Sequence, residues 1–363
     1  MTLLPSGLRR WRSCAVVLAA LLGGLLAASW PWDGPPPRAA AAEGPAPQLS
    51  RVRFGSPQAV SDAGVFLGRE WGFFQAQGIE VETLPFDSGP NVIAPLGSGE
   101  LEVGGGNFNL AVLNAVDRGV GIKIVADKGQ SRPGFEFSQL PVRRDLIESG
   151  AVRTPADLRG RRLGVASLRS GAEAIAARVL LQGGLTVDDV DLTVLSYPDM
   201  LTALANGAID GGVLIEPTLS AAVDRHLVAP WEPGYTSVAF NGPYQAGVLY
   251  FSDRFIAQAE LARRFMIAYL QGVRVYNDAF GKGVRRADVI RVLARETPLK
   301  DPAVYDRMNM AGLDPDGRLQ RASMQIELDY YRQRGYYTGA QTVDSVVDSS
   351  FAEYAAAQLG PYQ

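Results

Sequence analysis

The stretch YPDMLTALANGAIDGGVLIEP, residues 197–217, decides the fold. It predicts a short helix that begins at residues 198–199, because proline is tolerated in the first turn and aspartate supplies a hydrogen-bond acceptor. Residues 206–207, Asn-Gly, let the chain adopt a positive φ and end that helix. Residues 212–215 are short and apolar, as in a strand covered on both faces. Glu216 follows, where an open α/β sheet presents groups to a ligand.

The same design occurs once before in the chain. Residues 89–106, GPNVIAPLGSGELEVGGG, again combine a helix-sized apolar piece, a Ser-Gly turn, an acidic position and a strand-like end. The pattern Leu-x-x-Gly-x-x-acid occupies residues 96–102 and 204–210. Two copies predict two lobes of related build that face each other. The alternative is that Leu-x-x-Gly marks any turn between a helix and a strand.

Length and composition limit the classes of protein to consider. With 363 residues, 47% of them hydrophobic, the chain can bury a core in each of two lobes. Its formal net charge is -3 and its positive side chains form no stripe, which argues against nucleic acid as a partner. Cys14 is the only cysteine, so we expect no disulfide framework and no cysteine metal site. We also expect no cofactor, because there is no Walker loop and lysines are few.

The N-terminus has the three parts of a secretory signal peptide. Arg9, Arg10 and Arg12 form a basic region, residues 15–28 an apolar one, and residues 40–42 a small-residue cleavage site. The apolar region is too short for a comfortable membrane span. We therefore expect residues 1–42 to be a signal peptide, residues 43–48 a linker, and the remainder an exported, periplasmic and soluble protein.

From residue 49 onward, strand and helix patterns alternate. Such alternation is typical of an α/β fold with a largely parallel sheet. Strands are predicted at residues 52–55, 79–84, 122–126, 162–166 and 191–195, and helices at 64–77, 107–118 and 172–181.

The alternation of strand and helix patterns is interrupted twice, which predicts two crossovers between the lobes. The first break covers residues 135–142, and the second, at 235–251, is predicted to hold two extended segments around Asn-Gly-Pro at 241–243. We therefore assign residues 49–138 and 245–363 to lobe 1 and residues 139–244 to lobe 2. After residue 253 the chain is predicted to be mostly helical, with C-terminal helices that pack on lobe 1.

Several weak motifs, in a specific order, carry a resemblance over essentially the whole mature chain. They are Gly68-x-x-x-Gly72-Phe73-Phe74, Gly78-Ile79-x-Val81, PFDSGP at 85–90, DLRGRRLGV at 157–165, Ile215-Glu216-Pro217, DPDGR at 314–318 and Val347-Asp348-x-Ser350-Phe351. In these motifs the chain resembles bacterial solute-binding proteins of ABC importers, of the nitrate/sulfonate/taurine and thiamine-pyrimidine type. It departs from that pattern at residues 100–102, where Glu-Leu-Glu replaces the usual Ile/Leu-Asp, and at the glycine-rich residues 105–106.

The resemblance implies a two-lobed periplasmic binding protein fold of type II, with two crossovers. It also implies a small-molecule solute between the lobes, and an ABC permease with its ATPase subunit as partners. We expect the protein itself to be a monomer.

Candidate ligand-binding residues lie in the loops that follow the predicted strands. In lobe 1 they are Ser56, Gln58, Asp62, Ser88, Asn107, Phe108, Asn109 and Arg132; in lobe 2 they are Ser167, Arg169, Ser170, Asp199, Glu216 and Tyr244. Backbone N–H groups at helix starts near Asn107 and Ser170 are suited to an anionic oxygen. Phe108 is suited to a planar part of the solute, and Glu216 to an N–H or ammonium group.

Each of these residues also has a purely structural interpretation. Asn107, Ser170 and Asp199 are typical helix caps, Arg132 and Arg169 typical solvated loop charges, and Tyr244 a candidate for packing at the crossover.

The leading hypothesis is an extracytoplasmic solute-binding protein for a small organic molecule, either a sulfonate or aminosulfonate or a pyrimidine-like compound. A sensory ligand-binding module is an alternative that the sequence does not separate from it. A relative of the pyrimidine-precursor synthases is a further alternative, but their cysteine-rich motif has no counterpart here and no catalytic set can be assembled.

The signal-peptide assignment predicts a shortened mature protein. Export should remove residues 1–42, because signal peptidase cleaves after small residues that follow an apolar region. Intact-mass measurement of the exported protein should give a mature chain that begins near residue 43. A mature protein that retains Met1 would contradict the assignment.

Overall fold

The computed structural model describes residues 49–363, and Pro47–Gln363 form one compact unit. The predicted signal peptide and linker lie outside the described residues. No helix within residues 49–363 combines the length and apolar character that a membrane crossing requires.

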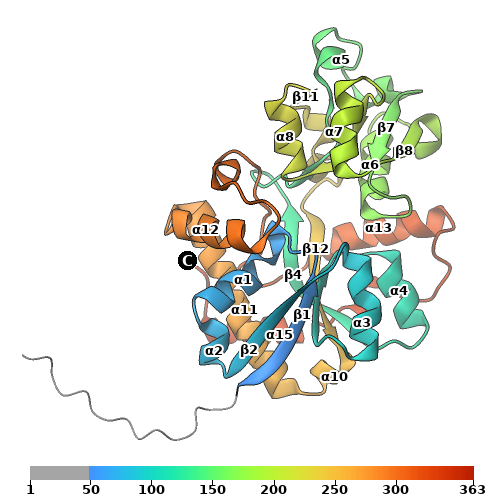
Figure 1. Cartoon of the computed structure of the whole chain (residues 1–363). Coiled ribbons are helices and arrows are strands. Elements are labelled where there is room, and N and C mark those ends of the chain that lie inside the picture. The colour runs from blue at the N-terminus through green and yellow to red at the C-terminus, as the bar shows by residue number, and fades with distance from the viewer. Residues whose placement is uncertain (1–48) are drawn as a thin grey trace, which may run out of the picture. The chain divides into compact units, whose positions relative to one another are not determined.

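Lobe 1 is built on a five-stranded sheet in the order β2-β1-β3-β12-β4 (Figure 1). Its strands are β1 (Ser50–Ser56), β2 (Ile79–Pro85), β3 (Val103–Gly106), β4 (Ile122–Ser131) and β12 (Tyr244–Ser252). Strand β1 is parallel to β2 and β3, whereas β12 is antiparallel to both β3 and β4. A strand from late in the chain therefore lies between two strands that are consecutive in sequence.

Helices cover both faces of this sheet and form two separate apolar cores. One core contains side chains of α1 (Ala63–Glu70), α2 (Phe73–Ala76), α11 (Ala259–Lys282), α12 (Arg286–Glu296) and α15 (Ser350–Leu359). The other contains side chains of α3 (Ile93–Ser98), α4 (Leu110–Asp117), α13 (Arg321–Gln333) and α14 (Val343–Val346). The predicted C-terminal helices are thus present. In α11, Phe265, Tyr269 and Val273 recur every fourth residue and are all buried, which keeps one face of the helix on the sheet.

Lobe 2 is built on a second five-stranded sheet, in the order β11-β6-β9-β7-β8. Its strands are β6 (Val142–Arg143), β7 (Arg162–Val165), β8 (Asp191–Val194), β9 (Gly211–Gly212) and β11 (Val228–Ala229). Its helices are α5 (Arg144–Glu148), α6 (Gly171–Leu181), α7 (Tyr197–Ala205), α8 (Thr218–Asp224) and α9 (Thr236–Ala239). Helix α10 (Asp253–Ile256) follows β12, and short 3-10 turns occur at Val60–Asp62, Gly89–Val92, Pro155–Leu158, Val187–Asp189, Glu232–Gly234 and Pro302–Asp306.

The chain passes between the two sheets after β4 and again before β12. Beside the first crossing, β5 (Ser138–Gln139) pairs with β10 (Leu214–Ile215) in a separate antiparallel ribbon. The strand predicted at 212–215 is therefore wrong as a single element, because β9 joins the lobe 2 sheet and β10 joins β5. The limits predicted for the lobes remain a prediction, since α13 packs against both β12 and α6.

Two further predicted elements differ from the structure. The helix predicted at 64–77 is broken at Gly72, whose φ of 74° lies in the left-handed region and separates α1 from α2. The second crossover does not begin with an extended segment. Residues Thr236–Ala239 form α9, and Gly242 closes that turn by donating its N–H to the carbonyl of Ser237, 2.8 Å away.

The two copies of Leu-x-x-Gly-x-x-acid have the same structure, which confirms the internal repeat. In lobe 1, Arg53 of β1 donates from Nη2 to the Gly99 carbonyl (2.8 Å) and to Oε1 of Glu102 (2.5 Å). The Arg53 N–H donates to the other carboxylate oxygen at 2.8 Å. One arginine therefore holds the helix end and the start of β3 against β1.

Lobe 2 repeats this arrangement with Arg162 of β7. Its Nη2 donates to the Gly207 carbonyl (2.8 Å) and to Oδ1 of Asp210 (2.9 Å), and its N–H donates to Oδ2 at 2.9 Å. Both glycines have a positive φ, 83° for Gly99 and 73° for Gly207, as a helix C-terminus that turns sharply into a strand requires. We call the two arrangements the arginine clamps.

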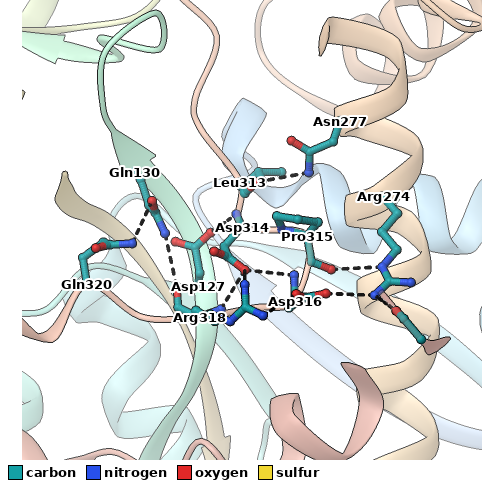
Figure 2. Close-up of polar contacts among 11 residues, drawn as sticks. Asp127, Gln130, Arg274, Asn277, Leu313, Asp314, Pro315, Asp316, Arg318 and Gln320 are labelled. Atoms are coloured by element: carbon teal, nitrogen blue, oxygen red, sulfur yellow. Dashed lines mark hydrogen bonds and ion pairs between the residues drawn. The ribbon is translucent and has the colours of Figure 1, made fainter. Parts of the chain in front are cut away.

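The DPDGR segment at 314–318 fastens the C-terminal region to the edge of the lobe 1 sheet (Figure 2). The N–H of Asp314 donates to the buried carboxylate of Asp127 on β4 at 2.8 Å. On the other side, Arg274 of α11 donates to the Pro315 carbonyl (3.2 Å) and to Asp316 (2.8 Å). The segment therefore covers the free edge of β4 and ties it to α11.

The arginine clamps predict a specific loss of stability. Burial alone would raise the pKa of Asp210, but hydrogen bonds from Arg162 hold it below its ordinary value of 3.8. Asp210→Asn should therefore lower the free energy of unfolding by about 1 to 3 kcal/mol at neutral pH. The loss should shrink as pH falls below 3.8, because Asp210 stabilises the fold through Arg162 only while its carboxyl group is ionised.

Urea unfolding at several pH values measures this effect. The control is Glu260→Gln, which removes an ion pair whose carboxylate side chain is 80% exposed, and it should change stability by less than about 0.5 kcal/mol. Equal losses in the two variants would show that the lobe 2 clamp does not stabilise the fold.

Candidate functional site

A cleft of about 660 Å³ lies between the two lobes. Lobe 1 lines it with the loops that follow β1, β2 and β3, and with parts of β4 and β12. Lobe 2 lines it with residues 166–172, which run from the end of β7 into the first turn of α6, and with further side chains of α6, α7 and β10. The cleft thus opens where parallel strands end, the usual ligand position in open α/β sheets.

The structure brings together seven of the fourteen predicted residues in the lining of this cleft. They are Ser88, Asn107 and Asn109 from lobe 1, Ser167, Arg169 and Ser170 from lobe 2, and Tyr244 at the return crossing. The sequence identified them by their position directly after strands or beside a crossover.

The lobe 1 wall of the cleft is polar. Asn109 is the N-cap of α4, since its Oδ1 accepts the N–H of Val112 at 3.1 Å, and its amide donates to the Asn107 carbonyl at 2.6 Å. The Asn107 side chain has only a long 3.5 Å contact with the Phe108 carbonyl among the described residues. A Cβ at Gly89 would lie 2.9 Å from Asn107 Oδ1, so the two loops meet closely only because residue 89 is glycine. Asn107 is therefore held in place with its amide available to a solute.

The lobe 2 wall presents the start of α6 and one cation. The Ser170 hydroxyl donates to the Ser167 carbonyl at 2.7 Å and does not cap α6. Arg169 has a φ of 55°, its N–H donates to Glu173 at 2.6 Å, and its guanidinium carbon lies 5.1 Å from the ring centre of Tyr336. Arg169 and the first turn of α6 therefore belong to the same wall of the cleft.

Apolar side chains make up much of the remaining lining. Phe137, Ile175, Tyr197, Val213 and Ile215 all contribute, and Leu168 lies at the same wall with 51% of its surface exposed. Sequence reasoning missed these residues, because an apolar side chain in a cleft and one in a core give the same sequence pattern.

A buried ion pair supports the floor of the cleft. Lys128 of β4, which lines the cleft, donates to Oδ1 of Asp62 at 2.7 Å and to the Ser61 hydroxyl at 3.0 Å. The two charged side chains are 3% and 0% exposed. Asp62 also accepts the Ser56 hydroxyl at 2.9 Å, so the predicted residues Ser56 and Asp62 lie behind the cleft and hold the lysine there.

Glu216 does not line the cleft, contrary to its predicted role as acceptor for the solute. Its carboxylate is 3% exposed and accepts hydrogen bonds from Ser220 N–H (3.0 Å), Ser220 Oγ (3.0 Å), Asn309 N–H (2.9 Å) and Asn309 Nδ2 (3.1 Å). Burial raises the pKa of Glu216 above its ordinary value. The carboxylate thus joins α8 to the C-terminal segment.

Four other predicted residues also lie outside the lining. Phe108 is 1% exposed in the core beneath α4, so it does not cover a solute. Arg132 stacks on Phe135, with 4.3 Å from the guanidinium carbon to the ring centre. Asp199 is exposed in the first turn of α7, where the cap is Ser196. Gln58 lies between two lining residues, and its N–H donates to Ser56 Oγ at 3.1 Å.

The buried ion pair gives a prediction about stability. Lys128→Met should lower the free energy of unfolding by about 3 to 5 kcal/mol, because it leaves the Asp62 carboxylate buried without its cation. The double variant Asp62→Asn/Lys128→Met should recover most of that loss. Thermal and urea unfolding measure both, with Lys300→Met at an exposed position as the control. A double variant as unstable as the single one would contradict this account of the pair.

Comparisons with solved structures show the fold. The periplasmic aliphatic sulphonate binding protein SsuA from Escherichia coli matches with a TM-score of 0.65 and 18% identity, over 82% of this chain and 92% of that one. SsuA from Xanthomonas axonopodis pv. citri, bound to MOPS, matches with 0.58 and 20%, over 85% and 98%. The desulfurization enzyme DSZB also matches, with 0.60 and 16%, over 85% and 100%. The predicted periplasmic binding protein fold is confirmed, and it hosts both binding proteins and an enzyme.

Sequence comparisons point the same way. A protein of Brucella abortus described as a binding protein is 22% identical over 213 residues, or 56% of this chain and 55% of that protein. The taurine-binding periplasmic protein of Escherichia coli is 26% identical over 151 residues, or 41% and 43%. The chain spans about half the length of the curated relatives it matches. The model of the family described as NMT1/THI5 like matches residues 60–278, more than half of the sequence. With the predicted resemblance and the fold in agreement, the chain belongs to the NMT1/THI5-like family.

Proposed function

We propose that this chain is the exported solute-binding protein of an ABC importer and that its solute is a small organic anion of the sulfonate class. The solute binds in the cleft between the lobes and is delivered to a permease coupled to an ATPase. The observation that carries this proposal is the pairing of a polar lobe 1 wall with a lobe 2 wall that offers a helix start, a cation and apolar side chains.

The charges around the cleft favour an anionic head group. The charged residues in the lining are Lys128, Arg169 and Asp87, and Asp87 is exposed. The acids predicted to face the solute do not line the cleft: Glu216 and Asp62 bind groups of the chain itself, and Asp199 is exposed on α7. An anion therefore meets hydrogen-bond donors and a cation, and the lining itself contains no buried carboxylate. A solute with an ammonium group is less favoured, because the Glu216 carboxylate that was expected to bind that group does not line the cleft.

The apolar lining favours an organic body on that anion. Phe137, Ile175 and Val213 offer the solute contacts that nitrate or sulfate cannot use. The cleft volume of about 660 Å³ suits a molecule larger than an inorganic ion. Pyrimidine-like solutes fit the apolar wall but make less use of Arg169.

Two lobes that share one site supply the means of capture. A solute that contacts Asn107 in lobe 1 and Arg169 in lobe 2 binds the closed arrangement better than an open one, and so shifts the protein toward closure. Micromolar affinity corresponds to about -8 kcal/mol, within reach of several hydrogen bonds and a buried apolar body.

The two alternative functions differ in what they require. A sensory module would bind the same solute but report to a receptor, so binding measurements alone do not distinguish it from an importer component. An enzyme needs a reactive group in the cleft, and no histidine or cysteine lines the cleft within residues 49–363. Turnover of a bound sulfonate or sulfinate to a desulfurised product would favour the enzyme.

The experiment is a binding screen that covers alkane- and arylsulfonates, taurine, aminopyrimidines, nitrate and sulfate. Thermal shift identifies binders, calorimetry gives their dissociation constants, and small-angle scattering should show compaction with a binder. Asn107→Ala should weaken sulfonate binding by about 1 to 3 kcal/mol, the usual cost of losing a hydrogen bond to a charged group.

The matched control is Asp199→Asn, at an exposed position outside the cleft, which should leave the dissociation constant unchanged. Stabilisation by nitrate or sulfate alone would contradict an organic anion. Binding that survives Asn107→Ala unchanged would move the site away from this cleft.

A further inference from the structure

Glu327 is a buried acid that the proposed function does not yet use. It lies on α13, 1% exposed, and its carboxylate accepts hydrogen bonds from the hydroxyls of Tyr244 (3.2 Å) and Tyr331. No ion pair to Glu327 occurs in the part of the chain that the structure describes. Nearly every other buried carboxylate has a cation or backbone N–H groups as donors, so two tyrosine hydroxyls are an unusual set of partners.

This carboxylate lies directly behind the cleft. Tyr244, the first residue of β12, lines the cleft and joins it to Glu327. Gly171, the first residue of α6, also lines it: a Cβ there would be 2.6 Å from Tyr244 Oη and 3.4 Å from Glu327 Oε1. The α6 start, the tyrosine hydroxyl and the acid are therefore in contact, and the acid is the one member that does not face the solute.

We propose that Glu327 is a positioning residue that sets the direction of the Tyr244 hydroxyl and thereby makes capture of an anionic solute depend on pH. The inference rests on the proposed function, since it takes the solute to be an anion bound beside Tyr244. In this arrangement protonated Glu327 favours capture and ionised Glu327 opposes it.

The reason lies in the number of available hydrogen atoms. A carboxylate only accepts, so ionised Glu327 takes the O–H of both Tyr244 and Tyr331, and Tyr244 offers the cleft nothing but lone pairs. A protonated carboxyl has one O–H of its own to donate. It donates to Tyr244 Oη, and the Tyr244 O–H is then released to donate to an anionic oxygen of the solute. Protonation also removes a negative charge from behind the α6 start.

The acid titrates in a useful range. Burial raises the pKa of Glu327 to about 7, against smaller opposing effects of the hydrogen bonds from Tyr331 and Tyr244. The titratable groups that face it are Tyr244 and Tyr250 from β12 and Tyr331 from α13 itself. From α6 comes Glu173, which the hydroxyls of Tyr330 and Tyr336 hold. The acid of α14, Asp344, is exposed and pairs with Arg321 at the surface instead. None of the facing groups is a cation that would keep Glu327 ionised.

The sign of the effect follows from linkage. A bound anion disfavours the carboxylate, so binding raises the pKa of Glu327 further and takes up a proton. Affinity is therefore greatest well below pH 7 and falls as pH rises through the pKa of about 7.

Calorimetry with 1-butanesulfonate tests the inference, because this probe keeps its charge between pH 5.5 and 8.5. The dissociation constant of the unaltered protein should rise roughly tenfold across that range, the usual effect of one charge-assisted hydrogen bond. Titrations in two buffers of different ionisation enthalpy should show proton uptake near pH 7.

Glu327→Gln keeps a side-chain donor for Tyr244, so its binding should stay near the low-pH value at every pH. Tyr244→Phe should bind weakly at every pH.

Asp127→Asn is the matched control, since Asp127 is the other buried acid whose pKa burial raises to about 7. Its carboxylate is held by the Gln245 side chain and two backbone N–H groups away from the cleft lining, so the pH dependence should persist in this variant. Persistence of the pH dependence in Glu327→Gln, with unfolding midpoints showing that it is folded, would overturn the inference.

Infrared titration separates this inference from the proposed function. The difference between the unaltered protein and Glu327→Gln should show a carboxylic-acid band that disappears near pH 7. If no sulfonate binds at any pH, the proposed function fails, and this band alone then decides whether Glu327 is protonated beside Tyr244. An ionised Glu327 at pH 5.5 would overturn the inference whatever binds.

Discussion

The two arginine clamps are the constraint on which the cleft depends. Arg53 and Arg162 each fix a helix end and the start of a parallel strand, and the strands that follow hold a matching register, Gly55 opposite Gly104 in lobe 1 and Gly164 opposite Gly212 in lobe 2. Each clamp fixes the start of a strand, so the position of that strand's carboxyl end is fixed as well. The loops that line the cleft begin at these carboxyl ends. The two lobes therefore carry different cleft residues at the carboxyl ends of their strands, although the same arginine clamp holds the opposite end of each sheet.

Much of this fold could be predicted from sequence, since local patterns decide most of its elements. The repeated Leu-x-x-Gly-x-x-acid gave two related lobes, because glycine at a helix end and an acid three residues later are both local requirements. The arginine that receives the acid was not predicted, since Arg53 and Glu102 are 49 positions apart and no spacing rule joins them. For the same reason residues 212–215 looked like one strand: an apolar run does not reveal that Gly212 pairs with β7 while Leu214 pairs with β5.

The predicted residues line the cleft where topology alone determines their position. Asn107, Ser167 and Arg169 follow strands of the two main sheets, and all three line the cleft. Glu216 also follows a strand, but that strand belongs to the separate ribbon, and Asn309, which arrives 93 residues later, occupies its carboxylate. Lys128 was missed because β4 continues beyond the apolar residues that predicted it. Contacts made by distant segments, Glu327 with Tyr244 among them, lie beyond any local pattern.

The placement of β12 between β3 and β4 also determines the order in which the protein can be built. A ribosome completes β3 and β4 first, but the two cannot pair with each other in the native sheet, because the strand between them is Tyr244–Ser252. All five strands of the lobe 2 sheet, β6 to β9 and β11, are synthesised during that interval. The lobe 2 sheet can therefore fold before β12 is made, whereas the lobe 1 sheet cannot join β3 to β4 until β12 has followed.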